Sequence, residues 1–302
     1  LVNCPFGAIS DKSQIFQLIQ AIKRGDKVVA AVAPAFVSQF GENVTSSQMR
    51  EAMRQVGFHK VIEVAVGADM CTAEEAEDFL KKVPEQQPFM ATSCCPSWSV
   101  MAKKLFPQFK DYISMAMTPM VLTARLYKKD HPDVRIVFIG PCTAKKLEAS
   151  RRTIRSDVDF VLTFEEMQGI FDAKGIVPSE MPYDPDDEFS TGTSLGRGFA
   201  VTGGVADAVK KAIAEIDPER EVLVEHADGL RECRKMLMMA KAGKYNGYLL
   251  EGMGCPGGCV AGAGTITPVK KSTAAVTRYV NEAKVKSVQE SAAVKRLREV
   301  QD

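Results

Sequence analysis

Eight cysteines are the residues of this sequence best suited to chemistry, because several of them fall in short segments rich in glycine and proline. Cys255 and Cys259 enclose a Pro-Gly-Gly run, and glycine lets a backbone approach a bulky inorganic group closely. Cys95 and Cys142 each lie beside a proline. Four such thiolates would suit either a [4Fe–4S] cluster or a four-thiolate zinc site.

The spacing of these cysteines favours an iron–sulfur cluster. Zinc fingers and zinc ribbons usually pair their ligands in short knuckles, whereas here only Cys255 and Cys259 are close together in the sequence. Ligands scattered through a large α/β core are more typical of a cluster. A zinc protein and a chain with buried structural thiols are the alternatives that spacing alone leaves open.

Other side chains near these cysteines could carry protons or charge. Cys94 directly precedes a candidate ligand, so it is either a small buried residue or a thiol that donates protons. Lys145 lies three residues after another candidate ligand and would bind an anion or lie at the surface. Glu75 and Asp78 share one face of a predicted helix and could pass protons, although acidic residues also favour a helix N-terminus.

Short apolar runs alternate with amphipathic stretches along the chain, which predicts an α/β architecture with largely parallel strands. Several runs are continuously apolar, as strands buried on both faces are. The predicted strands are 27–33, 61–66, 89–92, 135–139, 159–162, 221–224 and 248–250. The predicted helices are 11–24, 47–56, 72–82, 119–129, 164–171, 204–216, 229–241 and one long C-terminal helix near 273–299.

The cysteine segments follow three of the predicted strands directly. In open α/β sheets, sites form at the carboxyl ends of the strands, where loops from several strands can converge. We therefore predict an α/β fold with two lobes of mixed or parallel sheet flanked by helices, and a metal site between the lobes at the strand carboxyl ends. The acidic, proline-bearing stretch near 178–190 is the predicted boundary between the lobes.

The composition narrows the class of protein. The chain has 302 residues, of which 45% are hydrophobic and 25% charged, and its formal net charge is +1, without the basic excess of a nucleic-acid-binding protein. No apolar window is long enough to cross a membrane, and the first residues lack the basic region and apolar core of a signal peptide. We therefore expect a cytoplasmic protein with no nucleic-acid or membrane partner, whose clustered cysteines bind metal rather than form disulfides.

Three segments resemble, in order, the signature motifs of the [FeFe]-hydrogenase (iron-only hydrogenase) catalytic domain. They are Thr-Ser-Cys-Cys-Pro-Ser-Trp at 92–98, Gly-Pro-Cys-Thr-Ala-Lys-Lys-Leu-Glu at 140–148 and Glu-Gly-Met-Gly-Cys-Pro-Gly-Gly-Cys at 251–259. Weaker matches at 32–35, 67–70, 157–163 and 199–205 extend the resemblance over nearly the whole chain. Three long motifs in the right order make this resemblance very specific.

The resemblance implies an H-cluster. Cys95, Cys142, Cys255 and Cys259 would hold its [4Fe–4S] part, and Cys259 would also bridge to a two-iron unit that carries CO, cyanide and an azadithiolate. Dedicated maturation proteins make that unit, so a chain produced without them would lack it.

The resemblance also implies which residues surround the two-iron unit. Lys145 would hydrogen-bond one cyanide, and the backbone at Ala33 and Pro34 would bind the other. Met253 and Phe199 would line the pocket of the unit.

A proton relay is the third implication of the resemblance. Cys94 would exchange protons with the azadithiolate amine, and Glu75 and Asp78 would pass them outward. Thr118 stands where the best-known enzymes of the family usually have Ser in the relay, and Asp78 stands where they usually have Glu. Gly140 replaces their Met. These departures resemble less-studied branches of the family, including sensory ones.

The activity implied is the reversible oxidation of H2 to protons and electrons, with electrons passing through the cubane to ferredoxin or to an upstream ferredoxin-like domain. Because Cys4-Pro5 is similar to the end of a bacterial ferredoxin cluster motif, we expect residues 1–9 to be the remnant of such a module, with Cys4 ligating its cluster. Residues 10–302 would form the catalytic domain. The alternatives are an H2 sensor with slow turnover and a non-catalytic iron–sulfur protein of cluster assembly or electron transfer.

Overall fold

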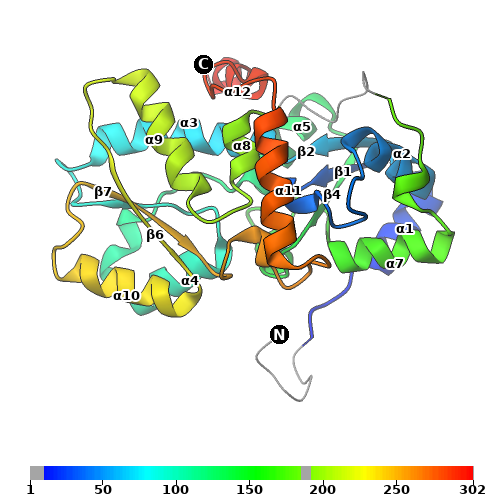
Figure 1. Ribbon diagram of the computed structural model, residues 1–302, viewed down its shortest axis with the longest axis horizontal. Helices are drawn as coiled ribbons and strands as arrows, with labels where there is room; N and C mark the ends of the chain where they lie inside the picture. Colours follow the sequence, from blue (N-terminus) through cyan, green and yellow to red (C-terminus); the bar gives the residue numbers. More distant parts are fainter. Residues whose placement is uncertain (1–9, 185–191, 302) are drawn as a thin grey trace. The chain divides into compact units, whose positions relative to one another are not determined.

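A computed structural model describes residues 10–184 and 192–301 of the chain (Figure 1). The predicted ferredoxin remnant at 1–9, with Cys4, lies outside the described residues. The chain divides into two compact units, each assembled from separate segments. Unit 1 comprises 1–64, 123–190 and 260–275, and unit 2 comprises 65–122, 191–259 and 276–302. The predicted boundary near 178–190 stays a prediction, because residues 185–191 lie outside the described residues.

Unit 1 is built on a four-stranded parallel sheet in the order β2-β1-β4-β5. Its central strand β1 is buried along its whole length, as its Val-Val-Ala-Ala-Val sequence predicts. The strands are β1 (Val28–Val32), β2 (Lys60–Glu63), β4 (Arg135–Gly140) and β5 (Phe160–Thr163). The helical elements are α1 (Ile15–Lys23), η1 (Pro34–Phe36), α2 (Ser46–Val56), α6 (Ala144–Ala149), α7 (Phe164–Lys174) and η3 (Pro178–Glu180).

Unit 2 is built on a three-stranded parallel sheet in the order β3-β7-β6. Helices α3 and α9 pack on one face of this sheet, and α4 and α10 pack on the other (Figure 1). The strands are β3 (Met90–Ala91), β6 (Leu223–Asp228) and β7 (Tyr248–Met253). The helical elements are α3 (Ala65–Lys82), α4 (Pro96–Leu105), η2 (Pro107–Tyr112), α8 (Ser194–Gly198), α9 (Gly204–Ile216), α10 (Leu230–Lys241) and α12 (Ala292–Gln301).

The chain passes from one unit to the other within three further helical elements, α5 (Pro119–Asp130), η4 (Cys259–Ala261) and α11 (Val269–Glu282). The predicted α/β class and the parallel pairing of the strands are confirmed. Among the described residues, no helix is both long and apolar enough to cross a membrane.

The single C-terminal helix predicted near 273–299 is wrong, because α11 ends at Glu282 and α12 begins only at Ala292. Between them the chain makes hydrogen bonds outside any helix: the Val285 carbonyl accepts a bond from the Ser194 N–H at 2.9 Å. Val288 is fully buried. Contacts with other parts of unit 2 therefore interrupt a sequence whose local pattern suits a continuous helix.

A fully buried carboxylate on α3 ties three segments of unit 2 together. Asp69 accepts hydrogen bonds from the Thr193 backbone N–H at 3.0 Å, the Thr193 hydroxyl at 2.5 Å and the Ser291 hydroxyl at 3.2 Å. Gly196 must lack a side chain here, because a Cβ would lie 2.4 Å from Asp69 Oδ1. Asp69 therefore anchors the start of α8 and the start of α12 to α3.

We expect Asp69→Ala to lower the free energy of unfolding by about 2–4 kcal/mol, because it leaves buried donors without an acceptor at about 1–3 kcal/mol each. Urea denaturation followed by circular dichroism measures this loss. Glu77→Ala is the matched control on the same helix, since Glu77 pairs with Arg298 at the surface at 3.1 Å. This substitution should lower the free energy of unfolding by less than about 1 kcal/mol. Equal losses for the two variants would contradict the anchoring role of Asp69.

Candidate metal centre

Three of the candidate ligands lie at one edge of the sheet of unit 2. Cys95 lies in the loop after β3, beside Cys94, whereas Cys255 and Cys259 lie in the loop after β7. Because β3 pairs in parallel with β7, the two loops leave the sheet at the same edge. None of these four cysteines is in a disulfide, and the three candidate ligands are half-buried.

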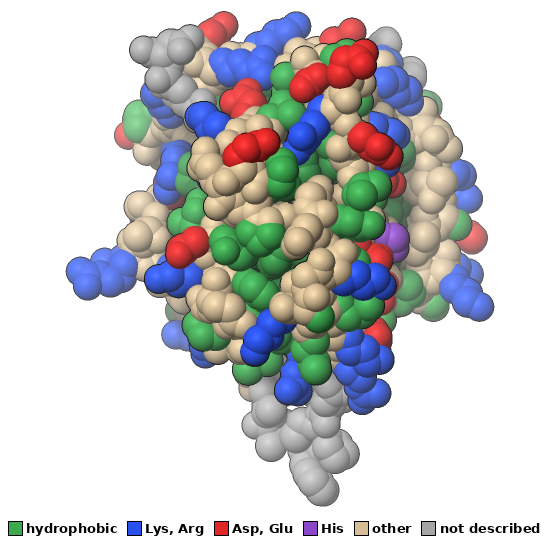
Figure 2. Space-filling view, turned by 90° about the vertical axis from the view of Figure 1, so that its left-hand side faces the viewer, with side chains coloured by type: hydrophobic (Ala, Val, Ile, Leu, Met, Phe, Trp, Pro, Cys, Tyr) green, Lys and Arg blue, Asp and Glu red, His purple; other side chains and the backbone are tan. Residues whose placement is uncertain are grey.

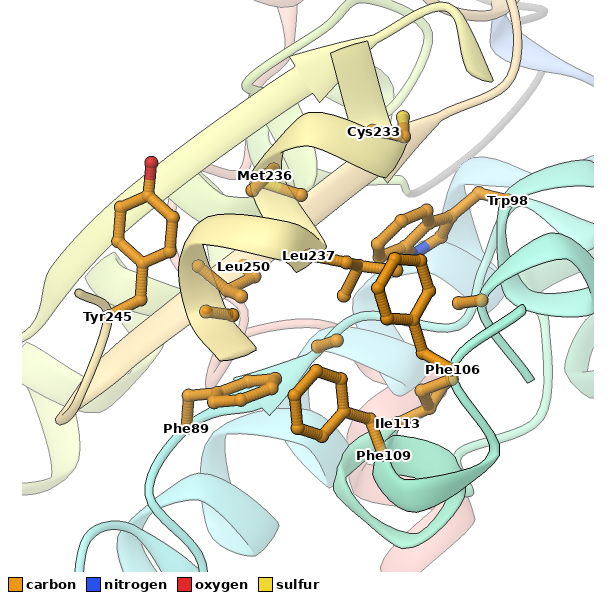
Figure 3. Packing of buried hydrophobic residues seen from close by; sticks show 13 residues of the cluster. Phe89, Trp98, Phe106, Phe109, Ile113, Cys233, Met236, Leu237, Tyr245 and Leu250 are labelled. Atoms are coloured by element: carbon orange, nitrogen blue, oxygen red, sulfur yellow. The ribbon is translucent and has the colours of Figure 1, made fainter. Parts of the chain in front are cut away.

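The core beneath these loops joins β3 and β7 to the helices α4 and α10 (Figure 3). Trp98, fully buried on α4, packs its ring against β7 at Gly252, where a Cβ would lie 2.1 Å from the ring. The Trp98 indole N–H also donates to the Thr92 carbonyl at 3.0 Å. Because α4 begins immediately after Cys95, this packing holds that thiol against the end of β7.

The loop from Cys255 to Cys259 has a backbone that glycine alone adopts easily. Gly257 and Gly258 have φ angles of 100° and 90°, and a Cβ on Gly258 would lie 2.6 Å from the Thr202 nitrogen. The Gly254 N–H, just before this loop, donates to the Cys95 sulfur at 3.3 Å.

Such hydrogen bonds to cysteine sulfur are one means by which proteins tune iron–sulfur clusters. The thiols of this edge and the Gly254 N–H that donates to Cys95 therefore fit an iron–sulfur group. The described residues contain no group of three or more His, Cys, Asp or Glu side chains that could hold a single metal ion. Cluster ligation by Cys95, Cys255 and Cys259 stays a prediction, which the loop geometry and the sulfur hydrogen bond support.

The remaining candidate ligand, Cys142, belongs to unit 1 and follows β4 directly. Lys145 lies in the first turn of α6 and is buried, and its ammonium donates to Glu148 Oε2 at 2.7 Å. Because Glu148 is buried as well, this ion pair fixes the Lys145 side chain on α6.

Unit 1 also brings together the two segments for which cyanide binding is predicted. Ala33 and Pro34 follow β1, the neighbour of β4 in the sheet, and the Ala33 N–H donates to the Ile139 carbonyl at 2.9 Å. A Cβ on Gly140 would lie 3.1 Å from that of Ala33 and 2.5 Å from the Phe138 ring. The Phe138 ring thus fills the space that a larger residue at 140 would need.

Two further predicted residues, Met253 and Phe199, are both buried in unit 2. Met253 ends β7, and its carbonyl accepts from the Gly229 N–H at 2.9 Å and from the Cys233 thiol at 3.3 Å. Phe199 follows α8 immediately. Their role in lining a pocket stays a prediction.

Glu251, in the third motif, anchors the end of β7 to the start of α9. Its fully buried carboxylate accepts from the Gly203 N–H at 2.8 Å and from the Ala206 N–H at 2.7 Å. Burial raises the pKa of Glu251, and the backbone donors of α9 partly oppose that rise. No sequence pattern predicted a role for this residue.

The predicted proton carriers Cys94 and Glu75 are both buried in unit 2. Burial raises the pKa of the Cys94 thiol well above its usual value, and the nearby Cys71 and Glu75 raise it further. Burial raises the pKa of Glu75 to about 7, against hydrogen bonds from the Ser114 side chain and the Ser93 N–H, the latter at 3.2 Å. Glu75 Oε2 is buried with no hydrogen-bond partner in the described part of the chain.

The other two predicted relay residues differ from each other in exposure. Asp78 is partly exposed and accepts a hydrogen bond from Lys82 Nζ at 2.6 Å. Thr118 is buried, and its hydroxyl has no partner among the described residues. The hydroxyl that lowers the pKa of Glu75 belongs to Ser114, a residue that no sequence pattern places beside α3.

We expect Glu75→Gln to change how stability depends on pH. The folded-state pKa of about 7 lies above the ordinary glutamate value of 4.5, so the stability that Glu75 contributes is fully present below about pH 4.5 and is lost as the pH rises through about 7. Between about pH 4.5 and pH 7, the free energy of unfolding of the wild type should therefore fall by up to about 3 kcal/mol relative to that of Glu75→Gln. Urea unfolding at about pH 4 and about pH 8 measures the difference.

The control for this pH experiment is Glu77→Gln, which changes a surface carboxylate of the same helix. That variant should keep the pH profile of the wild type. A parallel profile for wild type and Glu75→Gln would show that the pKa of Glu75 is the same in the folded and unfolded states, and would contradict the expected rise.

The chain belongs to the iron-only hydrogenase family, because residues 26–263 match the family described as iron only hydrogenase large subunit, C-terminal domain. It is 29% identical over 314 residues to iron hydrogenase 1 of Clostridium pasteurianum, in an alignment that covers 86% of this chain and 54% of that protein. A variant of the apo [FeFe]-hydrogenase HydA1 from Chlamydomonas reinhardtii has the same fold, with a TM-score of 0.77 and 23% identity over 95% of this chain and 94% of that one. The family indicated by the three motifs is confirmed.

Relatives of another kind match as well. Cytosolic iron-sulfur assembly component 3 of Rattus norvegicus is 27% identical over 288 residues, which covers 78% of this chain and 60% of that protein. The chain spans about half the length of the first hydrogenases it matches, 54% in the case of the Clostridium pasteurianum enzyme. The family is therefore established, and the reaction is a separate question.

Proposed function

We propose that this domain catalyses the reversible oxidation of H2 to protons and electrons at an H-cluster. In this proposal Cys95, Cys142, Cys255 and Cys259 supply the thiolates of a [4Fe–4S] cluster. When bound, the two-iron unit would supply the Lewis-acid chemistry by which H2 is split or formed. The protein would contribute ligation, orientation of the cyanides and transfer of protons.

The observation that best supports catalysis is the buried pair of Cys94 and Glu75 beside a candidate ligand. A chain that only held a cluster would have no need of a buried thiol next to Cys95 and a buried carboxyl behind that thiol. The pKa of Glu75, about 7, suits a group that gives and takes protons near neutral pH. We propose that Cys94 passes protons to Glu75, and that Ser114 orients the carboxyl.

The buried ammonium of Lys145 is the second observation that favours catalysis over a role in cluster storage. A buried ammonium is costly unless its charge is balanced, and Glu148 balances it at 2.7 Å. The three hydrogens of an ammonium allow Lys145 to keep this ion pair and still donate to one anionic ligand. We propose that this ligand is a cyanide of the two-iron unit, and that backbone at Ala33 and Pro34 binds the other.

Ferredoxin, or a ferredoxin-like domain, is the proposed electron partner, and maturation proteins would deliver the two-iron unit. On the face shown in Figure 2, charges of both signs lie among hydrophobic side chains, in keeping with a formal net charge of +1. Charge on that face therefore singles out no partner. A cytoplasmic location is part of this proposal. The relatives do not decide the location, because one of them is named as a periplasmic hydrogenase.

A second candidate function is that of a non-catalytic iron–sulfur protein in cluster assembly, which the similarity to cytosolic iron-sulfur assembly component 3 favours. Such a protein would bind the cubane and no two-iron unit. An H2 sensor would bind both and turn over slowly.

The test is infrared absorption after anaerobic reconstitution with iron, sulfide and a synthetic two-iron precursor. We expect sharp CO and cyanide bands that shift under H2. A brown protein with cubane absorption and no such bands would support the assembly role and overturn the hydrogenase proposal. Bands that shift under H2 with turnover close to the background rate would support the sensor.

A further inference from the structure

Asp228, the last residue of β6, holds the loop that carries two of the candidate ligands. The residue lies outside all three motifs and pairs in register with Met253 of β7. Its Oδ2 atom accepts hydrogen bonds from the Gly257 N–H at 2.9 Å and from the Thr202 hydroxyl at 3.0 Å. One carboxylate oxygen thereby joins the end of β6, the segment before α9 and the middle of the cysteine loop.

The loop is held at Gly257 through both backbone polar groups. While the Gly257 N–H donates to Asp228, the Gly257 carbonyl accepts from the Thr202 N–H at 3.4 Å. The next residue, Gly258, passes so close to Thr202 that a Cβ would lie 2.6 Å from its nitrogen. The loop also closes on itself, since the Gly258 N–H donates to the Cys255 carbonyl at 3.0 Å. Gly257 is therefore the point at which the rest of unit 2 restrains the loop.

We propose that Asp228 is a positioning residue for the Cys255–Cys259 loop and that its charge lowers the reduction potential of the cluster held there. This inference rests on the proposed function only in that the two thiols bind a cluster. Both donors to Asp228 are neutral, so they orient the carboxylate without cancelling its charge. A fixed negative charge beside a cluster opposes the arrival of an electron.

The two effects of Asp228 can be separated by substitution. Because both hydrogen bonds end on one oxygen, the amide oxygen of Asp228→Asn can accept both, and this variant loses only the charge. Asp228→Ala loses the charge and both bonds. Glu225→Gln is the matched control, since it removes a carboxylate from the same strand and has no bond to the loop.

The measurements use the full chain reconstituted with iron and sulfide alone, without any two-iron unit. Iron and sulfide analysis gives the cluster content, a chelator challenge gives the rate of cluster loss, and a redox titration followed by electron paramagnetic resonance gives the potential. For Asp228→Asn we expect unchanged content and about a tenfold shift of the equilibrium toward the reduced cluster, which is about 59 mV for a one-electron couple. For Asp228→Ala we expect cluster loss to be about tenfold faster or more.

The outcomes distinguish this inference from the proposed function. A wild-type chain that binds no cubane would overturn the cluster assignment itself. A wild-type chain that binds the cubane, with the same potential in Asp228→Asn and Glu225→Gln, would overturn the electrostatic role. Equal rates of cluster loss in wild type and a folded Asp228→Ala would overturn the positioning role. If Asp228→Ala does not fold, Asp228→Asn still tests whether the charge of Asp228 lowers the potential. Thr202→Val then tests whether Asp228 positions the loop, because it removes one of the two hydrogen bonds and no charge.

Discussion

Cys259→Ala is expected to yield a folded chain that does not retain a cubane. In the proposed ligand set each cysteine supplies one of four thiolates, and alanine offers the cluster no ligand atom. Cys259 begins the short helix η4, where alanine is well tolerated, so the backbone of the loop should survive. Iron and sulfide should fall from about four of each per chain to well below one after desalting, with loss of the broad visible absorption.

The control for this experiment is Cys71→Ala, which removes a fully buried thiol of α3 that is outside the proposed ligand set. This variant should keep its iron and sulfide. Circular dichroism should show both variants folded. Retention of the cubane by Cys259→Ala together with its loss from Cys71→Ala would mean that the ligand set is misassigned.

Cys94→Ser is expected to keep the cubane and to lose H2 turnover by about 10²–10⁴-fold, the usual contribution of a positioned acid or base. Serine has nearly the shape of cysteine, but its hydroxyl is a far weaker acid than a thiol. The buried Glu75 would then be cut off from the reacting site. Dye-coupled H2 evolution by chain loaded with the two-iron unit measures the loss.

The matched control is Cys71→Ser, which makes the same chemical change at a second buried thiol. It should keep turnover within a few-fold of wild type, because no step of the proposed relay uses Cys71. Infrared bands should confirm equal loading of all three proteins. Full activity of a loaded Cys94→Ser protein would remove Cys94 from the proton path.

Much of the fold could be predicted from periodicity. Helix α9 has the bounds 204–216 that its apolar spacing predicts, and β4 and β7 each begin at the predicted residue. Helix α4 was not predicted. Its first residue is the proline that follows Cys95, and a segment of cysteines and proline is more typical of a loop. Local pattern likewise could not show that tertiary contacts break the C-terminal helix at Glu282.

The candidate site was predictable to the extent that its residues occur in motifs. The cysteines, Lys145 and Glu75 could be selected from residue type and spacing, with the structure adding burial and partners. Ser114 and Asp228 could not, because their roles arise from hydrogen bonds between segments that are distant in the sequence. A hydrogen bond between segments distant in the sequence places no constraint on the residues next to either partner, and so leaves no local pattern to detect.

The position of β7 in its sheet bears on how this protein is made. β7 is the middle strand of the order β3-β7-β6, yet it is the last of the three along the chain. During translation, β3 and β6 therefore leave the ribosome before β7, the strand with which each of them pairs. They cannot form the sheet until residues 248–253 have been synthesised. Until then, the helices on both faces have no sheet to cover. The loop that follows β7 forms later still, so in the proposed ligand set Cys255 and Cys259 become available only after β3, β6 and β7 have all been synthesised.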